Sequence, residues 1–159
     1  MANRHTQTCA IAGALNVLGD HWTLLLVREA FYGTTRFSEF QRNTGIAKTL
    51  LSDRLAFLEE EGIFEREDVG ERGTRYAYTL TEKGRALETV LVALAQWSNA
   101  HVFGKGNEPV VLVNRATGRA VPELRLRNRR GDPLAPDQLA FRAGPGASAA
   151  TRKRMETIE

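Results

Sequence analysis

The sequence has one cysteine, few histidines and no long apolar run, and each shortage excludes a class of protein. With Cys9 as its single thiol, the chain cannot form an intramolecular disulfide or a cysteine-rich metal site. No apolar stretch approaches the length of about eighteen residues that a transmembrane helix needs. The first residues lack the apolar core of a signal peptide, which predicts a cytoplasmic protein without a membrane partner.

Patterns that indicate catalysis are also missing. The histidines, His5, His21 and His101, are widely spaced and match no metal-ligand pattern. We find no Ser/His/Asp arrangement, no phosphate-binding loop and no paired-carboxylate motif. We therefore expect no enzymatic activity, no cofactor and no bound metal.

The charge is unevenly distributed along the chain. The 159 residues carry a net charge of +3, with a net −2 over residues 1–108 and a net +5 over residues 109–159. Six of the arginines lie between Arg115 and Gly131. Charge alone would place any contact with nucleic acid in the C-terminal third.

The periodicity of the apolar residues predicts four helices in the first sixty residues. They cover about residues 9–18, 20–32 (with Asp20 as the N-cap), 36–43 and 47–61, and glycines follow each of them. In the fourth helix, Leu51, Leu55 and Leu58 form a stripe with the i, i+4, i+7 spacing of a buried face.

A β-hairpin and a long helix are expected next. The segments I-F-E-R-E-D-V and R-Y-A-Y-T-L alternate as strands do, and the turn G-E-R-G-T joins them. A helix capped by Thr81 then continues to Phe103, and Gly104 ends it. This helix has an apolar seam of Leu87, Val90, Leu91, Leu94 and Trp97.

Helices followed by a hairpin are the order of a winged helix-turn-helix, so the predicted fold class is α+β. The recognition helix would run from Ala47 to about Glu60. Its apolar stripe leaves an exposed set of Lys48, Thr49, Ser52, Asp53 and, in part, Arg54. Because Glu59, Glu60 and Glu61 would be repelled by phosphate, only the first two turns can enter a groove.

Three arginines elsewhere are further candidates for contact with DNA. Arg72 and Arg75 flank the tip of the wing and could bind phosphate or the minor groove, or could simply keep the hairpin soluble. Arg36 begins a helix whose N-terminus could approach phosphate, but it could equally pair with a carboxylate. Lys48 and Arg54 are expected to position the protein on phosphates rather than to read bases.

The segments G-D-H-W-T-L-L-L-V-R-E-A-F-Y-G, G-I-A-K-T-L-L-S-D-R-L-A-F-L-E-E-E-G and Y-A-Y-T-L-T-E-K-G-R-A-L resemble the HxlR family of bacterial transcription regulators, relatives of the MarR group. The resemblance covers about residues 9–103. It implies a homodimer that binds a palindromic operator in double-stranded DNA, with the N-terminal and long C-terminal helices in the interface. The candidate interface residues are Ile11, Leu15, Leu87, Leu91, Leu94 and Trp97.

This sequence departs from the family pattern at three positions. His21 stands where lysine is usual, Ala47 where a capping serine or threonine is common, and Asp53 where glutamine is frequent. An aspartate can accept a hydrogen bond from cytosine N4 but repels phosphate, which indicates an altered operator sequence.

Control by an effector or by thiol chemistry is a further expectation. The resemblance implies that Cys9, just before the first helix, could sense oxidants or electrophiles. The alternative is that Cys9 is simply a small apolar residue at the start of a helix. Trp22 and Trp97 are expected to fill the core and the dimer interface, although they could line a pocket for a small apolar effector.

Three segments are predicted: a winged-helix and dimerisation domain at 1–105, a β-meander extension at 106–145 and a polar tail at 146–159. Longer HxlR-like proteins are similar to zinc ribbons in this extension, but here Thr117, Arg127 and Arg130 stand at the places of cysteines. The extension would therefore be a metal-free version. Its arginines could attract DNA non-specifically or pair with the Glu59–Glu61 cluster of a partner subunit.

Together these features predict a dimeric, sequence-specific transcriptional repressor that a small effector or thiol modification releases from DNA. The alternative is a dimeric ligand-binding or protein-interaction module of the same fold that has lost operator binding. Asp53 and the net negative charge of residues 1–108 favour this alternative.

Overall fold

The structure is a computed structural model that describes residues 5–6, 8–70 and 75–156. The chain divides into two compact units. One comprises Met1–Thr6 and Ala10–Leu91, and the other comprises Gln7–Cys9 and Val92–Glu159.

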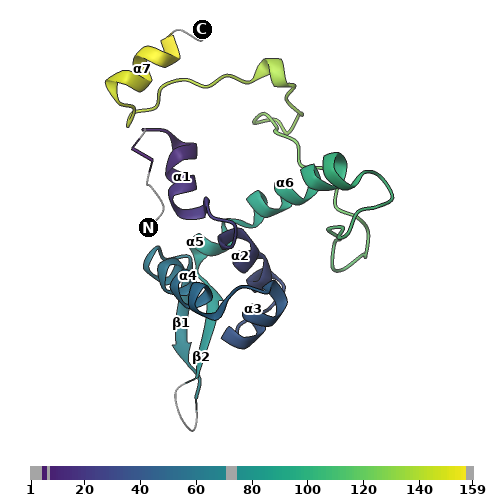
Figure 1. Cartoon of the computed structure of the whole chain (residues 1–159). Helices are drawn as coiled ribbons and strands as arrows, with labels where there is room; N and C mark the ends of the chain where they lie inside the picture. The colour runs from purple at the N-terminus through teal and green to yellow at the C-terminus, as the bar shows by residue number, and fades with distance from the viewer. Residues whose placement is uncertain (1–4, 7, 71–74, 157–159) are drawn as a thin grey trace. The chain divides into compact units, whose positions relative to one another are not determined.

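The first unit has the helix and strand order of a winged helix, as the sequence predicts (Figure 1). β1 and β2 pair antiparallel, in a register that places Phe64 opposite Leu80 and Asp68 opposite Tyr76. The elements are α1 (Ala10–Leu18), α2 (Thr23–Phe31), α3 (Phe37–Thr44), α4 (Lys48–Glu60), β1 (Phe64–Asp68), β2 (Tyr76–Leu80) and α5 (Glu82–Arg85).

One apolar core holds α2, α3, α4 and the hairpin together. The predicted stripe on α4 is confirmed, because Leu51, Leu55 and Leu58 are at most 1% exposed. The rings of Phe40 on α3 and Phe64 on β1 meet edge to face, with their centroids 5.9 Å apart. The remaining core residues are Leu26, Val27, Ile46, Ile63, Tyr78 and Leu80.

Local hydrogen bonds fix where the helices begin and end. Asp20 caps α2 as expected: its Oδ1 accepts hydrogen bonds from the backbone N–H groups of Trp22 at 2.8 Å and Thr23 at 3.1 Å. Gly45 ends α3 with a φ of 74°, a left-handed conformation that favours glycine. The turn between α3 and α4 is therefore specified by the sequence.

The loop before α3 adds a third, minimal strand to the hairpin. Arg36 forms an isolated antiparallel bridge with Ala77, and the backbone N–H of Tyr78 donates to the Thr35 carbonyl at 2.8 Å. This bridge joins the start of α3 to β2 and so connects the wing to the helix-turn-helix.

The prediction of one continuous helix from Thr81 to Phe103 is wrong. The segment forms α5, then α6 (Glu88–Ser98) and a π-helical turn, Asn99–Phe103. Thr81 caps α5, as predicted, by accepting from the Gly84 N–H at 3.1 Å, while its hydroxyl donates to the Gly62 carbonyl at 2.6 Å. These bonds hold α5 against the start of β1 and set its direction independently of α6.

The second unit contains less regular structure than its alternating sequence predicts. In the part of 106–145 where strands are expected, the structure has only two isolated bridges, Val113 with Ala120 and Arg127 with Pro133. Every proline of the chain lies after residue 108. Because proline lacks an N–H group, each proline interrupts a strand ladder at its position, which disfavours continuous strands there. A 3-10 turn, Pro136–Gln138, follows the second bridge.

The tail, to which the sequence assigns no structure, contains helix α7 (Ala149–Glu156). The Ser148 hydroxyl accepts from the Thr151 N–H at 3.2 Å and so caps its first turn. The Thr151 hydroxyl donates to the carbonyl of Thr8 at 3.1 Å. The first turn of α7 therefore contacts Thr8, the residue that precedes Cys9.

Across the described ranges, no single helix is both long and apolar enough to cross a membrane. α1 and α2 meet that criterion only when taken together, and they are bent by 77° relative to each other. Leu26 and Val27 of α2 are fully buried in the protein core.

Gly84 provides a test of this arrangement. A Cβ atom at Gly84 would collide with the carbonyl oxygen of Ile63, so we expect Gly84→Ala to destabilise the protein by about 1–3 kcal/mol. Gly13→Ala, in an open position of α1, is the matched control and should stabilise by about 0.5–1 kcal/mol. Thermal and urea unfolding measure both changes, and equal effects at the two positions would contradict the close approach.

Candidate nucleic-acid interface

The face that α4 presents to solvent is set by its buried stripe. Lys48, Thr49, Ser52 and Asp53 are all exposed on the first two turns of α4, as the sequence predicts. The helix begins after Ala47, whose side chain provides no cap. The first N–H groups of α4 therefore lack a side-chain acceptor from the N-cap residue, and a helix N-terminus of this kind favours an anion such as phosphate.

Arg54 lies in a different environment from the rest of the predicted set. Its Nη1 atom is 3.4 Å from Asp20 Oδ2, and its guanidinium lies 5.9 Å from the centroid of the Phe57 ring. The side chain is only 27% exposed. Arg54 therefore links α4 to the segment before α2, and its partial exposure is as the sequence predicts.

Asp20 is the acidic partner in this link. Burial alone would raise the pKa of its carboxyl group. Hydrogen bonds from the Thr23 hydroxyl and from the backbone N–H groups of Trp22 and Thr23, together with the charge of Arg54, outweigh burial and lower the pKa. Asp20 thus remains ionised and orients the recognition helix relative to α2.

A second buried carboxylate, Glu29, joins α2 to α3. It accepts hydrogen bonds from Asn43 at 2.9 Å, from Arg28 at 2.7 Å and from the Thr34 hydroxyl at 3.3 Å. Burial raises its pKa, but these bonds and the charge of Arg28 lower it further than burial raises it. Sequence reasoning missed this residue, although one charged pair inside the apolar segment T-L-L-L-V-R-E-A-F was a visible signal.

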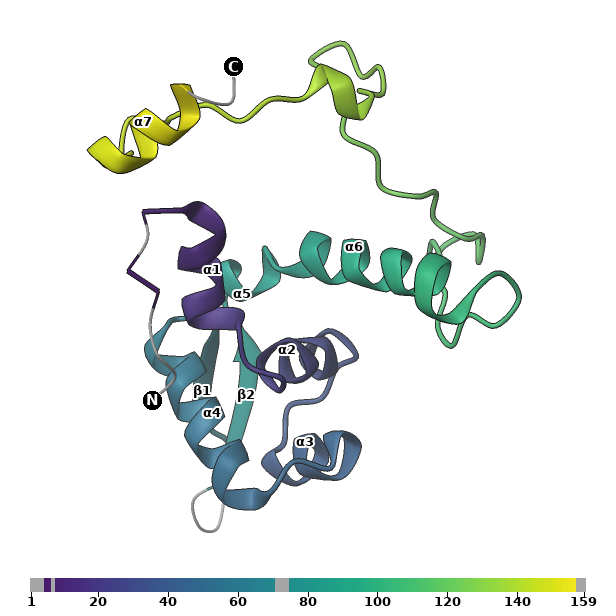
Figure 2. The same ribbon diagram turned by 45° about the horizontal axis from the view of Figure 1, so that its top comes forward.

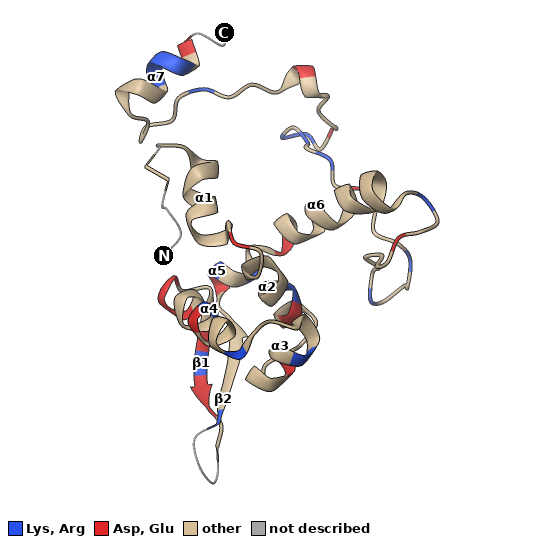
Figure 3. Cartoon of the chain, viewed as in Figure 1, with Lys and Arg blue, Asp and Glu red and all other residues tan. Residues whose placement is uncertain are grey.

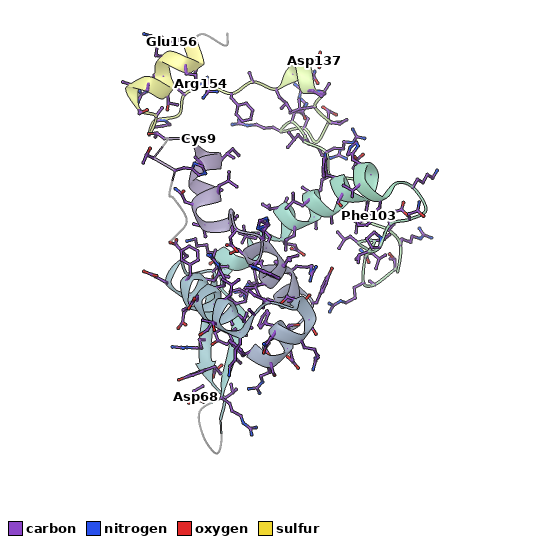
Figure 4. The ribbon with its side chains drawn as sticks, in the orientation of Figure 1. Cys9, Asp68, Phe103, Asp137, Arg154 and Glu156 are labelled. Carbon is purple, nitrogen blue, oxygen red and sulfur yellow. The ribbon has the colours of Figure 1, made fainter. Side chains whose placement is uncertain are left out.

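The wing is described up to its tip. Figure 4 shows Asp68 where β1 ends, and its Oδ1 accepts from the backbone N–H groups of Gly70 at 3.0 Å and Arg75 at 3.1 Å. These two bonds lower the pKa of Asp68. The Arg75 side chain is exposed at the base of the tip, whereas Arg72 lies outside the described residues.

Arg36 is exposed at the N-cap of α3, and its backbone N–H donates to Glu39 Oε2 at 3.3 Å. In the described part of the chain its guanidinium has no ion-pair partner, so the carboxylate pairing considered from the sequence is not observed. Arg42, at the end of α3, is exposed as well and was not among the sequence candidates. It belongs to the helix-turn-helix that α3 and α4 form.

The predicted interface residues divide into two groups. Ile11 and Leu15 on α1 and Leu94 and Trp97 on α6 are between 46% and 68% exposed. Leu87 and Leu91 instead pack against the core of the first unit. Both are half-buried within the chain, and their assignment to a subunit interface stays a prediction.

The two tryptophans also differ. Trp22 packs on the core, as expected, whereas Trp97 is 60% exposed and its ring lies 5.6 Å from that of His101. Neither lines the open cavity of about 230 Å³ in the first unit. That cavity is bordered by Ala30, Phe31, Thr34, Thr35, Tyr78, Thr79, Leu80 and Arg85.

In the described part of the chain, no group of three His, Cys, Asp or Glu side chains could hold a metal ion. This holds for the described residues of the C-terminal unit as well. Thr117 and Arg130 lie in exposed turns, and Arg127 is exposed in the bridge to Pro133. Asparagine side chains organise these turns: Asn114 Oδ1 accepts from the Thr117 N–H at 3.1 Å, and Asn128 Oδ1 accepts from the Arg130 N–H at 2.9 Å.

A helix-turn-helix with an exposed polar recognition helix, braced by a two-stranded wing, defines a winged-helix DNA-binding protein. Comparison with known families agrees: residues 17–105 match the HxlR-like helix-turn-helix family. The chain belongs to this family, whose members are transcription regulators and not enzymes.

Individual relatives extend the similarity past the winged helix. Rv3095 of Mycobacterium tuberculosis, an uncharacterised HTH-type transcriptional regulator, is 34% identical over 88% of this chain and 89% of its own length. The structure of PA1607, a candidate transcription factor, superposes with a TM-score of 0.79 at 42% identity, covering 86% of this chain and 95% of that one. PA1374 of Pseudomonas aeruginosa, also a candidate transcription factor, gives 0.66 at 37% identity, covering 92% and 99%.

A shorter solved relative is the redox regulator HypR in its reduced form. It gives a TM-score of 0.54 at 32% identity and covers 57% of this chain and 90% of its own. HypR thus matches a smaller share of this chain than PA1607 and PA1374 do.

Proposed function

We propose that the chain acts as a homodimeric, sequence-specific transcriptional repressor. The observation that carries the proposal is the division of α4: its apolar stripe is buried while Lys48, Thr49, Ser52 and Asp53 are exposed together on its first two turns. Short hydroxyl side chains at this place can hydrogen-bond to base edges in the major groove, and Lys48 can bind phosphate.

Further contacts would come from the wing and from the start of α3. Arg75 and Arg36 are exposed, and both provide guanidinium groups that bind phosphate bidentately. Arg72 in the wing tip remains a candidate from the sequence alone. Arg54, because of its pairing with Asp20, would orient α4 rather than contact DNA.

Two copies are needed for a palindromic operator, and exposed apolar surface supports their association. Ile11 and Leu15 on α1 and Val90, Leu94 and Trp97 on α6 are at least 41% exposed. Exposed apolar side chains on helices of one chain are typical of a subunit interface. A second copy would place two recognition helices about one DNA turn apart, roughly 34–36 Å.

Release from DNA by thiol chemistry is supported by the exposure of Cys9 next to α1 (Figure 4). A modified thiol at this place would alter how α1 packs in the dimer, and HypR provides a precedent for redox control among the relatives. A small effector in the cavity beside β2 is the alternative signal, since Thr34, Thr35 and Arg85 give that cavity polar groups.

The second candidate function is a dimeric module that has lost operator binding. Asp53 favours it, because an exposed carboxylate on the recognition helix repels phosphate. A footprint on the DNA beside the gene decides between the two functions. Protection of a palindromic site supports the repressor, and the absence of any protected site at every protein concentration supports the module.

The recognition helix is tested by Thr49→Ala with Ser52→Ala. Removal of two hydroxyl groups that contact bases should weaken operator binding by roughly 10- to 100-fold, while binding to unrelated DNA stays nearly constant. Mobility shift with operator and scrambled duplexes measures both quantities. Thr89→Ala, an exposed threonine on α6, is the control, and an equal loss in the control would contradict the assignment.

The subunit interface is tested by Leu94→Glu. A buried, unpaired carboxylate at the interface should convert the dimer to a monomer at micromolar concentration, as measured by sedimentation or light scattering. Leu139→Glu, at a similarly exposed leucine outside α1 and α6, should leave the dimer intact. A dimer that survives Leu94→Glu would show that α6 does not form the interface.

Thiol control is tested by Cys9→Ser. Diamide or a quinone should release the unmodified protein from its operator and should leave the serine variant bound, because only a thiol reacts with these reagents. Fluorescence anisotropy of a labelled operator follows the release. The same response in both proteins would exclude Cys9 as the sensor.

A further inference from the structure

The C-terminal unit contains two turns that are built in a similar way, each around an asparagine. In the first, the N–H of Asn114 donates to the Arg119 carbonyl at 2.8 Å, and Asn114 Oδ1 accepts from the N–H groups of Ala116 and Thr117. In the second, the N–H of Asn128 donates to the Asp132 carbonyl at 2.9 Å, and Asn128 Oδ1 accepts from the N–H groups of Arg130 and Asp132.

The flanking backbone repeats as well. The Val121 N–H donates to the Leu112 carbonyl, and the Leu134 N–H donates to the Leu126 carbonyl, each at 2.8 Å. Between each pair of bonded residues lies an isolated bridge, Val113 with Ala120 in the first turn and Arg127 with Pro133 in the second. Gly118, with a φ of 66°, and Gly131, with a φ of 90°, complete the two turns. Two similar turns are thus each fixed by an asparagine side chain.

Both turns expose arginine directly after the asparagine. Arg115 and Arg119 belong to the first turn, and Arg129 and Arg130 to the second; all four are exposed. The two other arginines of the segment have partners within it: Arg125 pairs with Glu123 at 2.6 Å, and Arg127 donates to the Gly131 carbonyl at 2.6 Å.

Among the described residues, the four turn arginines differ from Arg125 and Arg127 in having no partner for their charge. In the described part of the chain, no ion pair or side-chain hydrogen bond engages the guanidinium groups of Arg115, Arg119, Arg129 and Arg130. Basic residues recur along the whole segment after α6 (Figure 3). Exposed guanidinium groups without an ion-pair partner are suited to bind phosphate oxygens.

The first turn is also anchored. The Gln96 side chain on α6 donates to the Pro122 carbonyl at 3.1 Å and accepts from the Leu124 N–H at 2.8 Å, and Asn99 donates to the Val110 carbonyl at 2.9 Å. The segment that bears Arg115 and Arg119 is therefore attached to a helix at both of its ends, which is not expected of a merely solubilising tail.

We infer that these two asparagine-fixed turns form a second DNA-contacting surface that binds backbone phosphates without reading sequence. The inference rests on the proposed function, since it concerns how the same regulator holds DNA. It assigns to the C-terminal unit a contact that shorter relatives such as HypR, which match only 57% of this chain, do not share.

The test uses the full-length protein and a fluorescein-labelled, mixed-sequence 40-base-pair duplex (about four helical turns), titrated at several salt concentrations. Arg129→Gln with Arg130→Gln should lower the log–log salt slope by about 0.9 for each phosphate that the variant no longer binds. The affinity should fall roughly tenfold for each such phosphate at about 0.1 M salt. Arg125→Gln with Arg127→Gln removes the same charge from partnered side chains and should change both quantities much less.

Equal effects of the two double variants would overturn the inference, because net charge alone would then explain the weaker binding. An unchanged salt slope in Arg129→Gln with Arg130→Gln would overturn it as well and would leave the turns for an acidic protein partner. Circular dichroism and thermal unfolding confirm that each variant is folded, and Arg115→Gln with Arg119→Gln repeats the measurement in the other turn.

The proposed function fails separately. If the unmodified protein shows no sequence preference on the DNA beside its gene but the salt slope still depends on Arg129 and Arg130, the phosphate surface stands and operator recognition does not. If the protein prefers its operator but the salt slope does not change in any arginine variant, operator recognition stands and the phosphate surface does not.

Discussion

The burial of one side of α4 is the constraint on which the rest of the structure depends. Leu51, Leu55 and Leu58 pack into the core that Phe40 and Phe64 complete, and this packing fixes the rotation of α4 about its own axis. Because the helix cannot rotate, the polar side chains on its opposite side are presented as a set. Loss of the apolar stripe would therefore remove the site and the fold together.

Two carboxylates, one buried and one half-buried, fix the orientation of the packed helices relative to one another. Asp20 caps α2 and pairs with Arg54 of α4, while Glu29 of α2 accepts from Asn43 of α3. Apolar contacts alone tolerate small rotations, whereas hydrogen-bonded charges are satisfied in one geometry. The lowered pKa of each carboxyl group means that their contribution to stability is present at neutral pH and is lost as the pH falls through the folded-state pKa.

Much of the winged helix could be predicted from the sequence because its signals are local. The i, i+4, i+7 leucines, the caps at Asp20 and Thr81 and the glycine after α3 each specify an element without reference to distant residues. The exposed set on α4 followed from the same stripe. The pairing of Arg54 with Asp20 joins residues far apart in the chain, and no periodicity reports it.

The break between α5 and α6 and the shape of the C-terminal unit could not be predicted for a similar reason. The apolar seam continues through Leu87 and Leu91, so the pattern is that of one helix, yet Thr81 and Gly84 hold α5 against β1 (Figure 2). Beyond residue 108 the strict alternation of E-L-R-L-R indicates a strand. An alternating segment forms a strand only when a second strand pairs with it. Pro122 and Pro133 lie on either side of this segment, and each lacks the N–H group that a strand ladder would use.

The side chain of Gln96 provides what that missing strand would have provided. One amide group both donates to and accepts from the backbone of residues 122 and 124, as a neighbouring strand does at a single ladder position. The first asparagine-fixed turn is thereby attached to α6 as a side arm. While these two bonds are present, the position of α6 also determines where the backbone that follows the turn lies.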